Sequence, residues 1–120
     1  MRPLRDPRFQ RLCRLALGLL MAVVSWLAFR PADAPDLVLH ADKLRHLAAF
    51  GALAAVAALG WPPGRWQQAA IALGLLAYGL AIELIQSQLP TRSASAADWL
   101  ADAVGVGCGL LLARTLRRRY

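Results

Sequence analysis

Apolar residues gather in four long runs along the chain, and short polar segments separate them. The runs extend over residues 15–29, 47–61, 69–89 and 99–113. A helix needs about 20 residues to cross the hydrocarbon core of a bilayer, and each run reaches that length once a flanking turn is included. The segments between the runs hold Pro, Gly and Ser, which are typical turn residues. The pattern predicts four helices with short connections, so that consecutive helices run antiparallel.

The composition excludes most soluble classes of protein. Hydrophobic residues make up 58% of the chain and charged residues 18%, whereas ordinary soluble domains have about 45–50% and about 25%. A chain of 120 residues is one domain at most and has too little polar surface here for a soluble enzyme. Cys13 and Cys108 lie in or beside apolar runs and give no spacing for a disulfide framework. We therefore predict a single all-α domain over residues 1–120, an integral membrane bundle of four transmembrane helices.

The net charge of +7 belongs to the ends of the apolar runs and not to a polar face. Five arginines precede the first run and four follow the last. This placement is typical of membrane orientation and of contact with anionic lipids, and it argues against nucleic acid as a partner. With the N-terminus in the cytoplasm, the inner side holds 10 Lys and Arg residues and the outer side 4. The bias predicts that both termini are cytoplasmic.

The N-terminus also fits a second interpretation. A basic start, an apolar stretch and Ala32-Asp33-Ala34 are similar to a secretory signal with its cleavage site. Pro35 would directly follow the cut, which disfavours processing. In either case the loop before Asp42 faces outward.

Polar side chains recur at helical spacing at the ends of the runs that this orientation places outside. The pairs are Asp42 with His46, Glu83 with Gln86, and Asp98 with Asp102. Residues three or four apart share one face of a helix, so three helices aim polar groups at a common pocket. Ionisable groups inside a spanning segment usually face the bundle interior or a wet cavity, which makes Glu83 the most informative residue.

These residues also form a motif with fixed internal spacing. The motif reads Asp42-Lys43-x-x-His46-x-x-x-Phe50, then Glu83-x-x-Gln86-x-x-x-Pro90-x-Arg92-Ser93-x-Ser95-x-x-Asp98-x-x-x-Asp102-x-x-Gly105. It resembles the signature of VanZ-like membrane proteins, over about residues 40–112. The family often has tyrosine where Phe50 stands and usually asparagine where Asp102 stands. The resemblance implies a multi-pass protein of the bacterial plasma membrane that acts in the cell envelope, and the family is named for a protein associated with teicoplanin resistance.

Our leading hypothesis is a binding protein with a polar pocket at the outer face. Its expected ligand is an anionic envelope lipid, a lipid-linked precursor or a glycopeptide-related molecule, and a homo-oligomer is compatible with it. Lys43, Arg45 and Arg92 would hold phosphate, because their side chains form charge-assisted hydrogen bonds with its oxygens. The predicted ligand-binding residues are Asp42, Lys43, His46, Glu83, Gln86, Arg92, Ser95, Asp98 and Asp102.

A membrane-embedded hydrolase or transferase is the alternative. His46 would act as general base, with Asp42 orienting its ring from one turn earlier, and protonated Glu83 would donate a proton. No nucleophile elbow, zinc-helix motif or phosphate-cradling loop supports it. A metal held by His46, Asp42, Glu83 and Asp98 would be a loose signature, so we predict no metal and no cofactor.

A purely structural role explains the same residues without a ligand. Asp98 would cap a helix in a Ser95-x-x-Asp98 capping box, and Asp42 would cap another. Glu83 would pair with Arg92 or Lys43 and fasten helices together. The run from Gly105 to Gly109 contains a G-x-x-x-G spacing that favours close helix packing.

Overall fold

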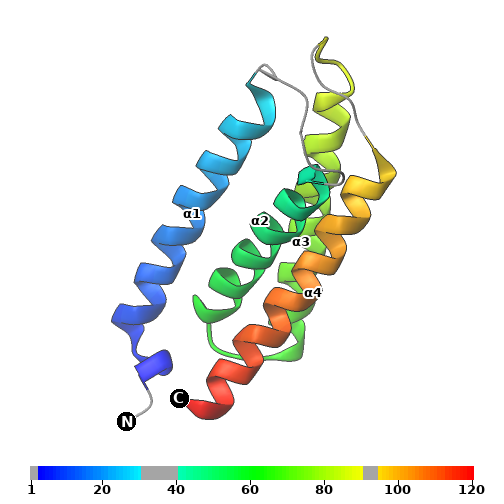
Figure 1. Ribbon diagram of the computed structural model, residues 1–120. Coiled ribbons are helices and arrows are strands. Elements are labelled where there is room, and N and C mark those ends of the chain that lie inside the picture. Colours follow the sequence, from blue (N-terminus) through cyan, green and yellow to red (C-terminus); the bar gives the residue numbers. More distant parts are fainter. Residues whose placement is uncertain (1–2, 31–40, 91–94) are drawn as a thin grey trace.

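A computed structural model describes residues 3–30, 41–90 and 95–120 of the chain, with side chains from residue 43 onward in the second range. These residues form a short 3₁₀ turn, η1 (Pro3–Arg5), and four α-helices, and they contain no strand. The helices are α1 (Pro7–Phe29), α2 (Ala41–Leu59), α3 (Arg65–Gln86) and α4 (Ala96–Arg119). The predicted all-α fold is confirmed (Figure 1).

The first helix begins well before its apolar run. Asp6 is the N-cap of α1, where its side chain accepts a 2.8 Å hydrogen bond from the backbone N–H of Arg8. Pro7 occupies the first helical position, where its missing N–H costs nothing and its fixed φ suits the helix. Most of the N-terminal arginines therefore lie on α1 and not ahead of it.

Glycines allow α2 and α4 to pack closely, and this pair of helices makes the most extensive contact in the described chain. A Cβ on Gly105 would lie 2.5 Å from the carbonyl oxygen of Leu47, and one on Gly109 would collide with the carbonyl oxygen of Gly51. The backbones meet because these positions carry no side chain. The predicted packing role of the G-x-x-x-G spacing is confirmed.

The first helix lies at the edge of the bundle but is tied to it by polar contacts. Arg14 donates a 2.7 Å hydrogen bond from Nε to the carbonyl of Gly60, and the Tyr78 hydroxyl donates to the carbonyl of Met21 at 3.0 Å. These bonds join α1 to the end of α2 and to α3. The Ala32-Asp33-Ala34 segment lies outside the described residues.

Three helices of the described chain, α1, α3 and α4, are long and apolar enough to cross a membrane. The shorter α2 is rich in alanine and has the most buried apolar segment, so its role as a fourth span stays a prediction. Leu12, Leu15 and Leu19 are about two-thirds exposed along α1 (64%, 65% and 67%), as expected of a lipid-facing surface. Both chain termini lie at one end of the bundle (Figure 1).

Candidate functional site

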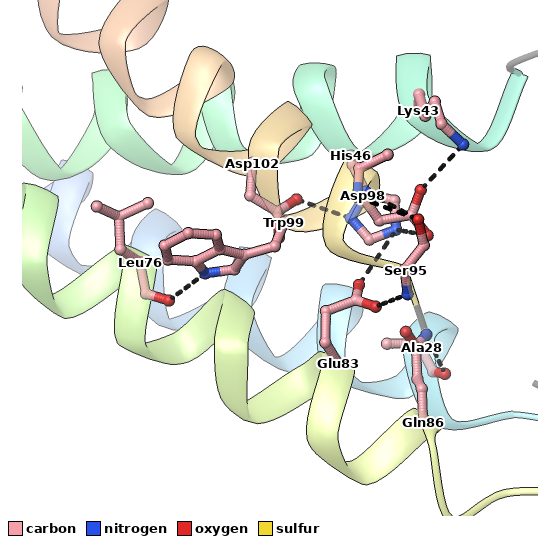
Figure 2. Close-up of polar contacts among 11 residues, drawn as sticks. Ala28, Lys43, His46, Leu76, Glu83, Gln86, Ser95, Asp98, Trp99 and Asp102 are labelled. Atoms are coloured by element: carbon pink, nitrogen blue, oxygen red, sulfur yellow. Dashed lines mark hydrogen bonds and ion pairs between the residues drawn. The ribbon is translucent and has the colours of Figure 1, made fainter. Parts of the chain in front are cut away.

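A cluster of polar side chains lies where α2 and α4 begin and α3 ends, at the end of the bundle away from the termini (Figures 1 and 2). His46 comes from α2, Glu83 from α3, and Asp98 and Asp102 from α4. The three carboxyl side chains are buried, with exposed fractions of 5%, 7% and 0% in that order. The structure thus brings together residues from three helices, as the helical spacing predicts.

The imidazole of His46 is held by Asp102. Nδ1 of His46 and Oδ1 of Asp102 are 2.7 Å apart. When Asp102 is ionised its carboxylate only accepts hydrogen bonds, so in that state Nδ1 of His46 carries the proton. Nε2 points away from Asp102 (Figure 2). Nε2 lies 3.8 Å from Oδ2 of Asp98 and 4.0 Å from Oε1 of Glu83 (Figure 2). Both distances exceed a hydrogen bond.

This contact was not among the predicted ones. The sequence reading gave Asp42 the role of orienting the His46 ring, because the two residues are four apart on one helix. The structure gives that role to Asp102 of α4, which the close packing of α2 and α4 brings within hydrogen-bond distance. The side chain of Asp42 lies outside the described part of the chain.

Glu83 links the end of α3 to the start of α4. Its Oε2 accepts a 3.0 Å hydrogen bond from the backbone N–H of Ser95. Its Oε1 is buried and has no hydrogen-bond partner among the described residues. Of the two predicted partners of Glu83, Lys43 makes its ion pair with Asp98 instead, and Arg92 lies outside the described residues.

Ser95 caps α4, but Asp98 does not take the part that the predicted capping box gives it. The Ser95 hydroxyl caps α4 by accepting from the N–H groups of Ala97 at 3.1 Å and Asp98 at 3.4 Å. The N–H of Ser95, which a capping box would pair with Asp98, is bonded to Glu83. The Asp98 carboxylate instead lies 3.4 Å from Nζ of Lys43 and faces His46. Asp98 is therefore available to the cluster.

Gln86 lies one turn beyond Glu83 and belongs to a neighbouring feature. Its side-chain amide donates a 3.0 Å hydrogen bond to the carbonyl of Ala28 in α1. Together with Arg45 and His46 it forms the polar part of the wall of a cavity of about 390 Å³. The rest of the wall is apolar and comes from α1, α2 and α3. The apolar residues are Val24, Leu27, Ala28, Ala48, Ala49, Phe50 and Ile82.

Two further residues shape the surroundings of the cluster: Phe50, which belongs to the motif, and Gly79, which no sequence pattern singled out. Phe50 is almost fully buried, with 2% of its surface exposed. A Cβ on Gly79 would lie 2.7 Å from Oδ2 of Asp102 and 3.3 Å from the Phe50 ring. Gly79 therefore lets the backbone of α3 pass directly over the Asp102 carboxylate. An isolated glycine inside an apolar run was the only signal in the sequence.

The cluster contains more negative than positive groups. Among the ion pairs of the described residues, the three carboxylates contact the ammonium of Lys43 and the imidazole of His46. With all three ionised, the described side chains carry an excess of negative charge even when His46 is protonated. One ligating atom each of His46, Glu83 and Asp102 lies within 4.8 Å of the others. The arrangement suits proton transfer at His46 Nε2 or the binding of a cation.

A family model described as VanZ/LLP1 matches residues 9–117 of the chain. The match includes every residue of the cluster and of the cavity wall. No curated protein and no solved structure matches the chain.

Proposed function

The chain belongs to the VanZ/LLP1 family and is a membrane protein, and from this premise we propose that it binds an anionic envelope lipid or a lipid-linked precursor. The observation that carries the proposal is the cavity of about 390 Å³ between α1, α2 and α3. Small-molecule sites in proteins have volumes of about 300–1,000 Å³ and are mostly apolar with a few polar groups. The cavity has both properties.

The cavity suits an amphiphile, because its wall combines three polar residues with seven apolar ones. The apolar wall, with Val24, Ala49 and Ile82, would hold an acyl or prenyl chain. Arg45 and His46 belong to the same wall and would meet a polar headgroup. A soluble, fully polar ligand would leave the apolar wall without a partner.

Basic side chains at this end favour an anionic headgroup. Arg45 lines the cavity, and Lys43 lies on the same turn of α2. Arg92, predicted to hold phosphate as a bidentate fork, would join them from the loop before α4. The headgroup would then lie beside the Asp98–Lys43 ion pair.

The proposal includes the orientation of the chain. We place both termini in the cytoplasm of a bacterial cell, α2 as a fourth span of the plasma membrane, and the cluster at the outer face. The Lys and Arg bias of 10 to 4 supports this placement. The N and C labels lie at the same end of the bundle (Figure 1), which supports an even number of membrane crossings.

Filling the cavity tests the proposal. Native mass spectrometry of the protein purified in mild detergent is expected to show a co-purified anionic lipid. Ala49→Phe adds a ring to the cavity wall and is expected to remove that lipid. Ala70→Phe, at an exposed position of α3 that does not line the cavity, is the matched control and should retain it. Equal lipid in both variants would refute the proposal. A teicoplanin adduct, formed when teicoplanin is added to the same preparation, would instead support the glycopeptide-related ligand.

One observation favours a second function, catalysis by acid and base. Asp102 fixes the His46 ring and leaves Nε2 facing Glu83 and Asp98, which is the arrangement of an oriented general base. His46 would accept a proton from water or from a hydroxyl group of the substrate, and Glu83 would return a proton to the leaving group. The substrate would be the same lipid-linked molecule.

Product release separates catalysis from binding. The protein in detergent is incubated with polyprenyl diphosphate, and inorganic phosphate is measured over time. An enzyme releases phosphate in the wild type and much less in His46→Gln. A binding protein releases none in either case.

A further inference from the structure

Three buried carboxylate oxygens of the cluster have no hydrogen-bond partner among the described residues: Glu83 Oε1, Asp98 Oδ1 and Asp102 Oδ2. Glu83 is 5% exposed. Buried polar atoms are almost always satisfied, because an unpaired one costs about 1–3 kcal/mol. Oε1 points toward Nε2 of His46 across 4.0 Å (Figure 2). The space between these two atoms is where a missing partner would lie.

His46 is oriented in the way that metal-binding histidines are. A histidine that binds a metal through one ring nitrogen typically donates its other N–H to a carboxylate, which fixes the ring and its tautomer. Here Nδ1 donates to Asp102 at 2.7 Å, so the lone pair of neutral His46 is on Nε2. That lone pair is directed into the space bounded by Glu83 and Asp98.

The carboxylates of Glu83 and Asp98 need to move only a short distance toward His46 Nε2 to share an ion with it. In a tetrahedral zinc site the metal–ligand bonds are about 2.0–2.2 Å, which sets the ligand atoms about 3.4 Å apart. Nε2 of His46 is 4.0 Å from Oε1 of Glu83 and 3.8 Å from Oδ2 of Asp98. Rotation of the carboxylates would bring each within coordination distance of an ion bound to Nε2. Nitrogen and carboxylate donors together favour Zn²⁺ or Mn²⁺ over Mg²⁺ or Ca²⁺.

We propose that this cluster binds a divalent transition-metal ion through His46 Nε2 and Glu83 Oε1, with Asp98 beside the ion and Asp102 positioning the imidazole. The ion fills the space that Oε1 faces and offsets the excess negative charge of the three carboxylates. Two protein ligands leave coordination positions open to water or to an oxygen of a bound molecule.

The metal site would also help the protein to bind an anionic lipid, and this part of the inference rests on the proposed function. His46 belongs both to the cavity wall and to the cluster, so an anionic headgroup that enters beside Arg45 would approach the carboxylates behind that imidazole. Like charges repel strongly where water is excluded. A bound divalent ion converts this repulsion into attraction, because its open positions accept phosphate oxygens. Cations held by few carboxylates and completed by phosphate are a common arrangement in phosphate-binding proteins.

Metal titration of the purified protein tests the site. Protein in detergent is stripped with a chelator, then titrated with Zn²⁺ by calorimetry and analysed for bound metal. The wild type is expected to bind one ion per chain. Glu83→Gln and His46→Gln are expected to lose at least tenfold in affinity, and Asp102→Asn about 10–100-fold, as other outer-shell substitutions do. Asp6→Asn, which keeps a helix-capping side chain at the far end of the bundle, is the control and is expected to bind as the wild type does.

The Co²⁺-loaded protein provides a second readout, because its visible absorption in the wild type reports the ligands of the ion directly. Visible absorption bands typical of nitrogen and oxygen ligands are expected for the wild type and should be absent from His46→Gln. Absence of Zn²⁺ binding in the wild type, or unchanged binding in His46→Gln, would overturn the proposal.

The two proposals fail separately. Lipid that stays on wild-type protein which binds no Zn²⁺ would overturn the metal site and leave lipid binding intact. Tight Zn²⁺ binding by a protein that never carries lipid would overturn lipid binding and leave the metal site intact.

Discussion

His46 on α2 and Asp102 on α4 are joined by a 2.7 Å hydrogen bond that crosses the closest helix pair of the bundle. The bond depends on backbone contact one to two turns away, where Gly105 and Gly109 let α4 approach α2. Packing and site geometry are therefore coupled in this protein. A change that separates these two helices also releases the His46 ring.

Removing the carboxylate of Asp102 should destabilise the protein. Asp102→Ala leaves Nδ1 of His46 without its acceptor in a buried site, which costs about 2–3 kcal/mol. Asp102→Asn keeps a carbonyl oxygen as acceptor and is expected to cost less than half of that. Unfolding by denaturant titration in mixed micelles measures both free energies. Equal losses for the two variants would show that charge, and not the hydrogen bond, holds the ring.

Adding one methyl group at Gly109 should separate α2 from α4. The new Cβ would collide with the carbonyl oxygen of Gly51 and lie 2.8 Å from the Cβ of Ala54. Overpacking of this kind costs about 1–3 kcal/mol. Gly107→Ala is the matched control, because a Cβ there meets nothing within 4 Å. The same unfolding titration compares the two variants, and equal stability would contradict the packing described here.

Glu83 should tolerate amide replacement but not truncation. Glu83→Gln keeps an oxygen that accepts from the Ser95 N–H, so α4 should still begin at its capped end. Glu83→Ala removes that acceptor and opens a buried space, which together cost about 2–4 kcal/mol. Thermal denaturation followed by circular dichroism separates the two variants. A Glu83→Gln protein as unstable as Glu83→Ala would indicate that the charge of Glu83 fastens the helices.

The proposed orientation predicts which residues an impermeant reagent reaches in cells. In a Cys13→Ala, Cys108→Ser background, a cysteine at Gln88, just past the end of α3, should react with a membrane-impermeant maleimide. A cysteine at Arg65, where α3 begins, should react only after the membrane is permeabilised. The opposite pattern would place the cluster on the cytoplasmic side.

Hydropathy and spacing were sufficient to predict the helices and most of the cluster. Four apolar runs gave four helices, because a backbone in an apolar setting must satisfy its own hydrogen bonds. The three- and four-residue spacings placed Glu83, Asp98 and Asp102 on inward faces because one helical face repeats at that interval. The start of α1 at Pro7 was missed, since it depends on the cap at Asp6 and not on hydropathy.

Hydropathy and residue spacing could not predict which helices contact one another. Spacing indicates which face a residue occupies but not which neighbouring helix approaches it, and so the contact of Asp102 with His46 was not predicted. The cavity beside Arg45 depends on side chains from three separate helices, and no local pattern encodes it. The role of Gly79 is likewise set by what lies opposite it, the Asp102 carboxylate.

The central claim is that the cluster around Glu83 serves a ligand and does more than fasten helices. Native mass spectrometry of wild type, Glu83→Gln and the control Asp6→Asn tests it most directly. We predict an anionic lipid on the wild type and on Asp6→Asn, and its loss from Glu83→Gln with unchanged helix content. A Glu83→Gln protein that keeps the lipid, or a wild type without lipid beside an unstable Glu83→Gln, would contradict the claim and assign the cluster to helix packing.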